Sequence, residues 1–127
     1  MRFETTTQRP VEARGVGLHS GVDVAIRIVP APTSTGIVFV RTDLNRFPIP
    51  ASWKYVARVS YATSLMRQGV LMSTTEHLLS VFYGMGIDNA IVEITSLEAP
   101  ILDGSGMPFV ALLEKAGRRQ LRRKRRY

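Results

Sequence analysis

The residues of this chain best suited to chemistry are Glu76 and His77, a carboxylate beside an imidazole at the predicted start of a helix. Between Arg67 and Asp88, Glu76 is the only Asp, Glu, Lys or Arg. Because a carboxylate can accept a proton and an imidazole can bind a metal ion, the pair has the composition of half a hydrolytic zinc site. A solvent-facing helix normally carries several charges, so this helix is predicted to face protein, a metal or a substrate.

Both residues also have structural explanations, which the spacing leaves open. Ser73-Thr74-Thr75-Glu76 matches the S-x-x-E capping box, in which Ser73 caps the helix and Glu76 bonds back to its N–H. Spacing alone favours this explanation for Glu76, and a lone histidine such as His77 is more often packed or exposed than a ligand. A hydrolytic zinc site needs about three protein ligands, and His19 is the one other histidine. The residues alone therefore predict only a half-site.

Composition indicates one folded domain. The 127 residues can bury a core, and the 45% hydrophobic content argues against disorder. There is no cysteine for a disulfide framework or a thiolate metal cage. No apolar run approaches the roughly 18 residues of a membrane span, and the N-terminus has no signal-peptide pattern. We therefore expect a soluble, cytoplasmic protein without membrane insertion.

The net charge of +7 comes from the C-terminal segment. Residues 118–127 carry seven basic residues and no acid, which leaves 10 Lys+Arg against 10 Asp+Glu in residues 1–117. A nucleic-acid module more often spreads basic and aromatic side chains over a folded face, so no nucleic-acid partner is expected. We interpret residues 1–117 as a domain and 118–127 as a basic linker towards a second domain, with a polyanion contact as the alternative.

Periodicity and turn residues indicate an α+β fold. Strands are predicted over residues 22–29, 37–41 and 89–95, a hairpin over 63–66 and 70–72, and an edge strand or loop over 47–50. One helix is predicted over 75–85, stopped by Gly84 and Gly86. A second is predicted from a Ser105 cap to Ala116, with Pro108 in its first turn and Gly117 after its end. Strands joined by hairpins, with helices late in the chain, favour an α+β layer over a doubly wound sheet.

The first predicted helix has a wider apolar arc than one sheet face requires. At about 100° per residue the arc spans roughly 200°. It contains Leu78, Leu79, Val81, Phe82, Tyr83 and Met85. The remaining arc holds Glu76, His77 and two small residues that allow another backbone to approach closely. A second partner surface is therefore predicted.

Five ordered motifs carry a family resemblance. They are Gly15-Val16-Gly17-Leu18-His19-Ser20-Gly21, Arg41-Thr42-Asp43-Leu44, Ser73-Thr74-Thr75-Glu76-His77-Leu78, Gly86-Ile87-Asp88-Asn89 and Pro100-Ile101-Leu102-Asp103-Gly104-Ser105. Over about residues 5–117 the chain resembles the UDP-3-O-acyl-N-acetylglucosamine deacetylases, zinc amidases of the lipid A pathway of Gram-negative bacteria. The resemblance implies a two-layer α/β sandwich with a mostly antiparallel sheet and two helices on one face. A second domain of similar fold is expected to pack its helices against these.

The resemblance also implies roles for individual residues. Glu76 matches the family's general base, and His77 matches the zinc ligand that this domain supplies. His19 matches a histidine near the site, and Tyr61, Ala62 and Thr63 match a loop that borders the UDP-sugar substrate. Ala62 stands where some members have cysteine.

The resemblance assigns the family's remaining zinc ligands, an H-x-x-x-D pair, to the second domain, so they are expected to lie outside this sequence; His19 and Asp23 share that spacing but belong to the first domain. The resemblance therefore implies an N-terminal domain that is inactive alone, because one ligand cannot hold catalytic Zn²⁺ tightly. Its helical face is expected to bind a second domain or to self-associate. Two other classes stay open: a non-catalytic module whose basic tail binds a polyanion, and an assembly domain that kept the fold without the chemistry.

Overall fold

The computed structural model of the chain describes residues 3–16, 21–51, 56–59, 62–68, 70–73, 76–96 and 107–124. These residues form a five-stranded sheet, two smaller sheets, two α-helices and one 3-10 helix. In chain order the elements are β1 (Phe3–Thr7), β2 (Val11–Val16), β3 (Asp23–Pro30), β4 (Ile37–Arg41), η1 (Thr42–Leu44), β5 (Phe47–Pro50), β6 (Val56–Val59), β7 (Ala62–Arg67), β8 (Val70–Ser73), α1 (Glu76–Gly84), β9 (Ala90–Ile94), α2 (Met107–Ala116) and β10 (Arg118–Lys124).

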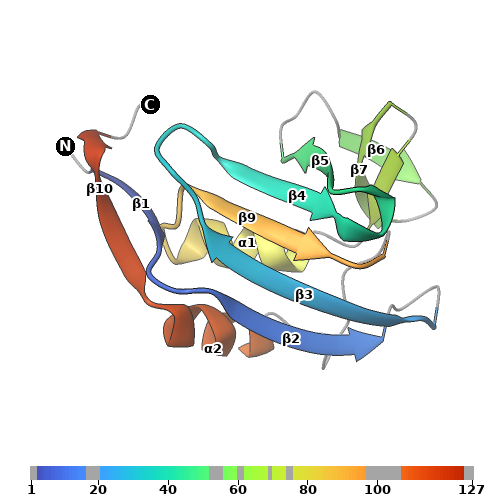
Figure 1. The fold of residues 1–127 in the computed structure, drawn as a ribbon, viewed down its shortest axis with the longest axis horizontal. Coiled ribbons are helices and arrows are strands. Elements are labelled where there is room, and N and C mark those ends of the chain that lie inside the picture. Colours follow the sequence, from blue (N-terminus) through green and yellow to red (C-terminus); the bar gives the residue numbers. More distant parts are fainter. Residues whose placement is uncertain are drawn as a thin grey trace.

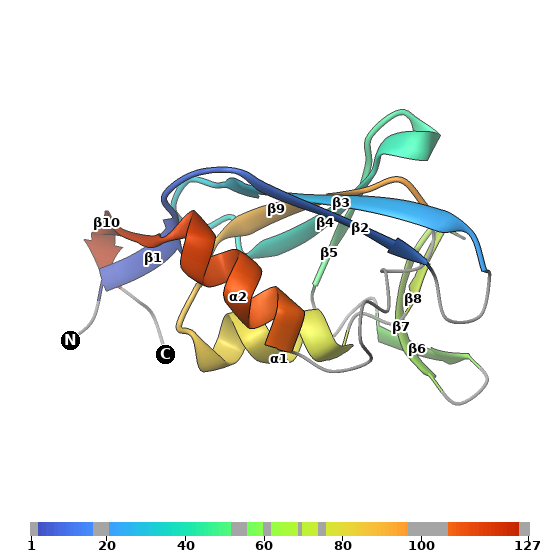
Figure 2. The same ribbon diagram turned by 90° about the horizontal axis from the view of Figure 1, so that it is seen from below.

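The five-stranded sheet is the scaffold of the fold. Its order is β2-β3-β9-β4-β5, with a parallel β4–β9 pair and three antiparallel pairs. Strand β9 follows α1 in the chain but lies between β3 and β4 (Figure 1). Both helices lie on one face of this sheet (Figure 2). The predicted α+β class, a mostly antiparallel sandwich with two helices on one face, is confirmed.

The core lies between the helices and the five-stranded sheet. Helix α1 buries Leu78 and Phe82, and α2 buries Phe109 and Leu113, which belong to one cluster with Phe39 of β4. Fully burying a side chain of this size stabilises the fold by about 1.5–3 kcal/mol. Packing therefore fixes how each helix is rotated about its own axis, and so which residues remain on its outer face.

The second helix ends where the sequence predicts, at Ala116 before Gly117. Gly117 has a φ of 74° and its N–H donates to the carbonyl oxygen of Leu113 at 3.0 Å, the geometry of a glycine that terminates a helix. Its own carbonyl accepts from the N–H of Gln8 at 2.9 Å, which ties the helix end to the β1–β2 connection. Pro108 is the second residue of the helix, and Ser105 lies outside the described residues. Neither described helix is long and apolar enough to cross a membrane.

The predicted strands are confirmed with small shifts of their ends. Strand β4 has the predicted bounds, while β3 and β9 begin one residue later than predicted. Strand β5 is an edge of the five-stranded sheet, where Pro48 and Pro50 are tolerated because no central ladder needs their N–H groups. Strands β7 and β8 form the predicted hairpin, with Gln68 at a φ of 51° in its turn.

Apolar alternation does not predict β1, β2, β6 or β10. Strand β10 occupies residues predicted to be a basic linker, and it pairs antiparallel with β1. Its described side chains are mostly exposed, as their charge predicts, but residues 118–124 form a paired strand. Backbone bonds to β1, rather than burial of apolar side chains, order this segment. The division of the chain at residue 117 stays a prediction.

A buried polar cluster attaches β1 to the main sheet. The Thr6 hydroxyl donates to the carbonyl oxygen of Asn89 at 2.7 Å and accepts from the N–H of Ala31 at 2.9 Å. The Asn89 amide donates to Glu4 Oε1 at 2.9 Å and accepts from the N–H of Gly36 at 2.8 Å. Buried polar groups are costly unless they are hydrogen-bonded. These bonds therefore define where β1 lies, although it contributes little apolar surface.

Candidate active site

The two candidate catalytic residues, Glu76 and His77, are the first two residues of α1. The helix is anchored directly behind them, because Leu78 and Phe82 are 0% and 1% exposed. The side chains of Glu76 and His77 lie outside the described structure, so their positions are known here at the level of the backbone. The fold thus places both residues together at the N-terminal end of a helix that is held in the core.

A helix N-terminus is a suitable place for this chemistry. The first backbone N–H groups of a helix have no partner within it, and the aligned peptide dipoles give this end a partial positive charge. Negative charge is stabilised here and positive charge is disfavoured. A carboxylate and a neutral imidazole are the forms needed by a general base and by a metal ligand.

The residues matched to a substrate loop lie near the strand that leads to α1. Ala62 and Thr63 are the first two residues of β7, and the next residue, Ser64, pairs with Ser73 at the end of β8. The backbone of Thr63 therefore lies beside the end of β8. That strand ends at Ser73, three residues before Glu76 in the chain. Tyr61 and His19 lie outside the described residues, and the roles of all four residues stay predictions.

The predicted capping box is also untested. Ser73, its expected N-cap residue, is the last residue of β8, and α1 begins at Glu76. Residues 74 and 75 lie outside the described structure. The structural explanation of Glu76 and the catalytic one therefore both remain open at this point.

The described residues do not form a zinc site by themselves. No group of three or more His, Cys, Asp or Glu side chains that could hold a metal ion is found among them. A catalytic zinc site uses about three protein ligands and one open position, whereas α1 offers His77 and its neighbour Glu76. The donor set in the described part of the chain is therefore too small for catalytic zinc.

The outer side of α1 is only partly covered. Leu78, Val81 and Phe82 are buried, whereas Tyr83 is 90% exposed and Leu79 is partly buried. Surface depressions flank the helix: one is lined by residues of α1 and α2, and the other extends from Tyr83 to Ile37 and Ala51. The predicted apolar arc therefore extends beyond what the sheet covers. What binds there stays a prediction.

Charged residues on the opposite face of the sheet form a separate network. Arg27 of β3 contacts Glu12 at 3.4 Å and Glu93 at 3.2 Å, and Arg46 bonds to the other carboxylate oxygen of Glu93. Burial of Glu93 opposes its ionisation, but hydrogen bonds and charges from Arg46 and Arg27 outweigh this effect and lower the pKa of Glu93. The charges in this network compensate one another, which is typical of a structural surface.

Motifs with a family resemblance have clear structural roles where they are described. Arg41, which is 7% exposed, donates to both carboxylate oxygens of Asp43 at 2.9 and 2.7 Å, and this pair shapes the turn after β4. Asp88 accepts from the N–H of Thr5 at 2.9 Å, next to the Asn89 cluster. The segments 17–20 and 97–106 lie outside the described residues.

Sequence reasoning missed one residue that holds α1 in place. Arg118 Nη1 donates to the carbonyl oxygen of Met85 at 2.8 Å, just after the end of the helix. A cation at a helix C-terminus is favourable because the last carbonyl groups are unpaired and carry partial negative charge. No local pattern could identify this contact, since 33 residues separate the partners.

Comparison with known proteins decides the family. The family model described as "LpxC: UDP-3-O-acyl N-acetylglycosamine deacetylase" matches residues 4–127. The chain belongs to this family. The resemblance inferred from the five motifs is therefore confirmed.

Three relatives illustrate the match. The chain is 80% identical over 127 residues to the UDP-3-O-acyl-N-acetylglucosamine deacetylase of Solibacter usitatus (strain Ellin6076). This match covers 100% of this chain and 43% of that protein. It is 50% identical over 119 residues to the enzyme of the same name from Shewanella sp. (strain ANA-3), covering 92% of this chain and 39% of that protein. The Chromohalobacter salexigens protein of that name is 50% identical over 115 residues, covering 90% and 38%. The chain thus spans about two fifths of the length of these relatives.

Proposed function

We propose that this chain supplies Glu76 and His77 to the active site of a zinc-dependent deacetylase of lipid A biosynthesis, acting in the cytoplasm. The substrate would be UDP-3-O-acyl-N-acetylglucosamine, the compound in the names of the relatives. The observation that carries the proposal is the position of both residues in the first turn of α1, within a chain whose family is deacetylases. Because the chain spans 43% of its Solibacter relative, we attribute this activity to a longer assembly that includes it.

In this proposal Glu76 is the general base. Its carboxylate accepts a proton from the water that attacks the N-acetyl carbonyl carbon, and the same proton can pass to the amine nitrogen as the C–N bond breaks. The products are acetate and a free amine on the sugar. Negative charge is generally stabilised at a helix N-terminus, which supports a catalytic carboxylate in the first turn of α1.

His77 would be one ligand of the zinc ion, which polarises the carbonyl and activates water when it is bound. The remaining ligands would come from sequence corresponding to the part of the relatives that this chain does not cover. The chain alone is then expected to bind zinc weakly and to be inactive. His19, Tyr61, Ala62 and Thr63 would contact the substrate, and for Thr63 the register of β7 and β8 favours this role.

The uncovered side of α1 is our candidate for the surface that completes the site. The 90% exposure of Tyr83 supports an apolar contact beyond the sheet, with a second domain or with another copy of the chain. Either partner would approach the same helix whose first turn carries Glu76 and His77. The non-catalytic assembly domain is the alternative, and the variants below separate it from the enzyme.

The test uses a chimera in which this chain replaces the matching 43% of the Solibacter relative. Acetate release from the UDP-sugar should fall by about 10²–10⁴-fold in Glu76→Gln, the range for loss of a general base. His77→Ala should lower both activity and zinc content, whereas Glu12→Gln, at an exposed carboxylate on the opposite face of the sheet, should preserve both.

Two results would contradict the proposal. Unchanged turnover in Glu76→Gln and His77→Ala chimeras would favour an assembly domain without chemistry. Turnover at an ordinary enzymatic rate by the isolated chain would show that its own residues suffice, contrary to the proposed split of the zinc ligands.

A further inference from the structure

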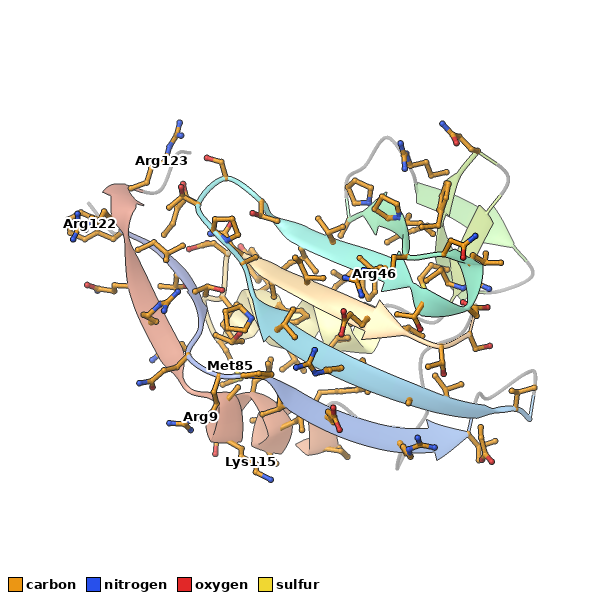
Figure 3. All side chains as sticks on the ribbon, in the orientation of Figure 1. Arg9, Arg46, Met85, Lys115, Arg122 and Arg123 are labelled. Carbon is orange, nitrogen blue, oxygen red and sulfur yellow. The ribbon has the colours of Figure 1, made fainter. Side chains whose placement is uncertain are left out.

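One margin of the molecule collects basic side chains from three parts of the chain. We call it the basic margin and define it by Arg9, Lys115, Arg118, Arg119, Arg122 and Arg123, all of which are exposed. Figure 3 shows Arg122 and Arg123 towards one end of β10 and Arg9 and Lys115 beside the end of α2, all along the same edge of the molecule. The fold therefore brings Arg9 and Lys115 to the charge run that the sequence places at residues 118–126.

Within the part of the chain that the structure describes, acids compensate few charges of the basic margin. Arg9 donates to the carbonyl oxygen of Lys115 at 2.6 Å, and Arg118 donates to that of Met85, so both bond to neutral groups. Arg123 approaches Glu4 Oε2 at 3.8 Å, but Glu4 also accepts from Asn89 and from the Ser34 N–H. The exposed Glu114 makes no ion pair within the described part of the chain. A net positive surface remains.

Three other arginines of the described structure contrast with this margin. Arg27 and Arg46 share Glu93, and Arg41 makes a bidentate pair with Asp43. Charged side chains along an edge strand can simply prevent it from pairing with other chains. A few such charges suffice for that purpose, whereas the basic margin extends past β10 to the end of α2 and to Arg9. Its extent indicates a surface that binds an anionic partner.

We propose that the basic margin binds the surface of an anionic lipid membrane. Phe3, which is 37% exposed, lies opposite Lys124 in the β1–β10 pair and gives this edge an apolar side chain that can enter the headgroup region. Binding of single-stranded nucleic acid generally relies on a groove with several stacked aromatics. Strands β1 and β10 together contain one aromatic residue, Phe3, rather than a row of stacked aromatics, which favours the lipid surface.

Arginines close to an anionic membrane surface each raise binding about fivefold. The test measures sedimentation of the full chain with vesicles of phosphatidylglycerol and phosphatidylcholine in equal parts, and with phosphatidylcholine alone. We expect binding only to the anionic vesicles, and release as salt screens the charges. The R119Q/R122Q double variant should bind roughly 25-fold more weakly.

Matched variants separate this surface from net charge and from folding. R14Q/R46Q removes the same number of charges away from the basic margin and should bind within about twofold of the unmodified chain, since screening limits distant charges. R119K/R122K keeps the charges and should retain binding. Thermal unfolding of each variant checks that β10 persists.

The proposal does not depend on the proposed deacetylase, because vesicle binding is measured without turnover. Absence of binding to anionic vesicles at low salt would overturn it. If R14Q/R46Q weakened vesicle binding as much as R119Q/R122Q, binding would depend on net charge and not on the basic margin. Loss of binding in R119K/R122K would show that binding depends on the structure of β10 and not on its charge. Tighter, competing binding of a single-stranded oligonucleotide would identify the partner as nucleic acid instead.

Discussion

Glu93 on the outer face of the sheet is the residue whose ionisation is most clearly linked to the fold. Arg46 and Arg27 hold its pKa below the ordinary value of 4.5, although its burial acts in the opposite direction. The folded chain then binds fewer protons than the unfolded chain at acidic pH. Stability from ionised Glu93 is therefore fully present above pH 4.5 and is lost as the pH falls through the lowered pKa.

We predict that Glu93→Gln lowers the free energy of unfolding at neutral pH by at most about 1 kcal/mol, the usual limit for exposed ion pairs. The difference between the two proteins should shrink as the pH falls below the lowered pKa. Urea unfolding at a series of pH values measures both free energies. Removing one partner with Arg46→Gln should move the acid transition to higher pH, and an unchanged acid profile in Glu93→Gln would contradict the linkage.

At the scale of secondary structure, the sequence predicts the elements that bury an apolar face. Strand β3 alternates buried apolar residues with less buried ones, β4 and β9 are short and largely apolar, and both helices have apolar stripes followed by glycines. The parts of the candidate site carried by α1 could therefore be placed at the start of a helix. Element positions follow from the sequence where burial decides them.

Strands β1 and β10 could not be predicted in this way, because other forces order them. Three consecutive threonines in β1 include Thr6, which bonds to Asn89 and Ala31, partners 83 and 25 residues away. Strand β10 carries arginines and a lysine, a composition typical of a solvated segment. The proposed zinc site could likewise not be completed from this sequence, since the resemblance assigns the remaining ligands to a second domain.

The end of α2 provides a sharp test of one predicted boundary. Gly117 has a φ of 74°, and a Cβ placed on it would lie 2.9 Å from Gln8 Oε1. Gly117→Ala should therefore lower the free energy of unfolding by about 1–2 kcal/mol, the cost of a left-handed conformation for a residue with a Cβ. Urea unfolding at neutral pH measures this change.

Gly84→Ala is the matched control, because Gly84 is the last residue of α1 and a Cβ there meets nothing within 4 Å. It should be neutral or stabilising by up to about 1 kcal/mol, since alanine favours helix. Equal effects of the two substitutions would mean that the loss of stability does not come from the left-handed conformation of Gly117.

At the scale of the whole molecule, charge and packing are distributed unevenly. The helices cover one face of the five-stranded sheet, and its other face carries the compensated Glu93 network. Residues 118–127 supply the entire net charge of +7, and 118–124 are at the same time a strand that pairs with β1. One segment therefore affects stability through its backbone and solubility through its side chains, and these two contributions can be separated.

Deleting residues 118–127 should lower the free energy of unfolding by about 2–4 kcal/mol, because several backbone hydrogen bonds of about 1 kcal/mol each are lost. The bond from Arg118 to the end of α1 is lost with them. A full-length variant with Gln at all seven basic positions of this segment keeps the strand, so it should lose much less stability.

Both proteins have 10 basic and 10 acidic residues left, and both should aggregate near neutral pH because a net charge of zero removes mutual repulsion. Urea unfolding and turbidity measure the two properties separately. If the deletion left the free energy of unfolding unchanged, the β1–β10 pair would contribute nothing to the stability of the fold. If the Gln variant stayed as soluble as the unmodified chain, the charges of the basic segment would not be what keeps the chain in solution.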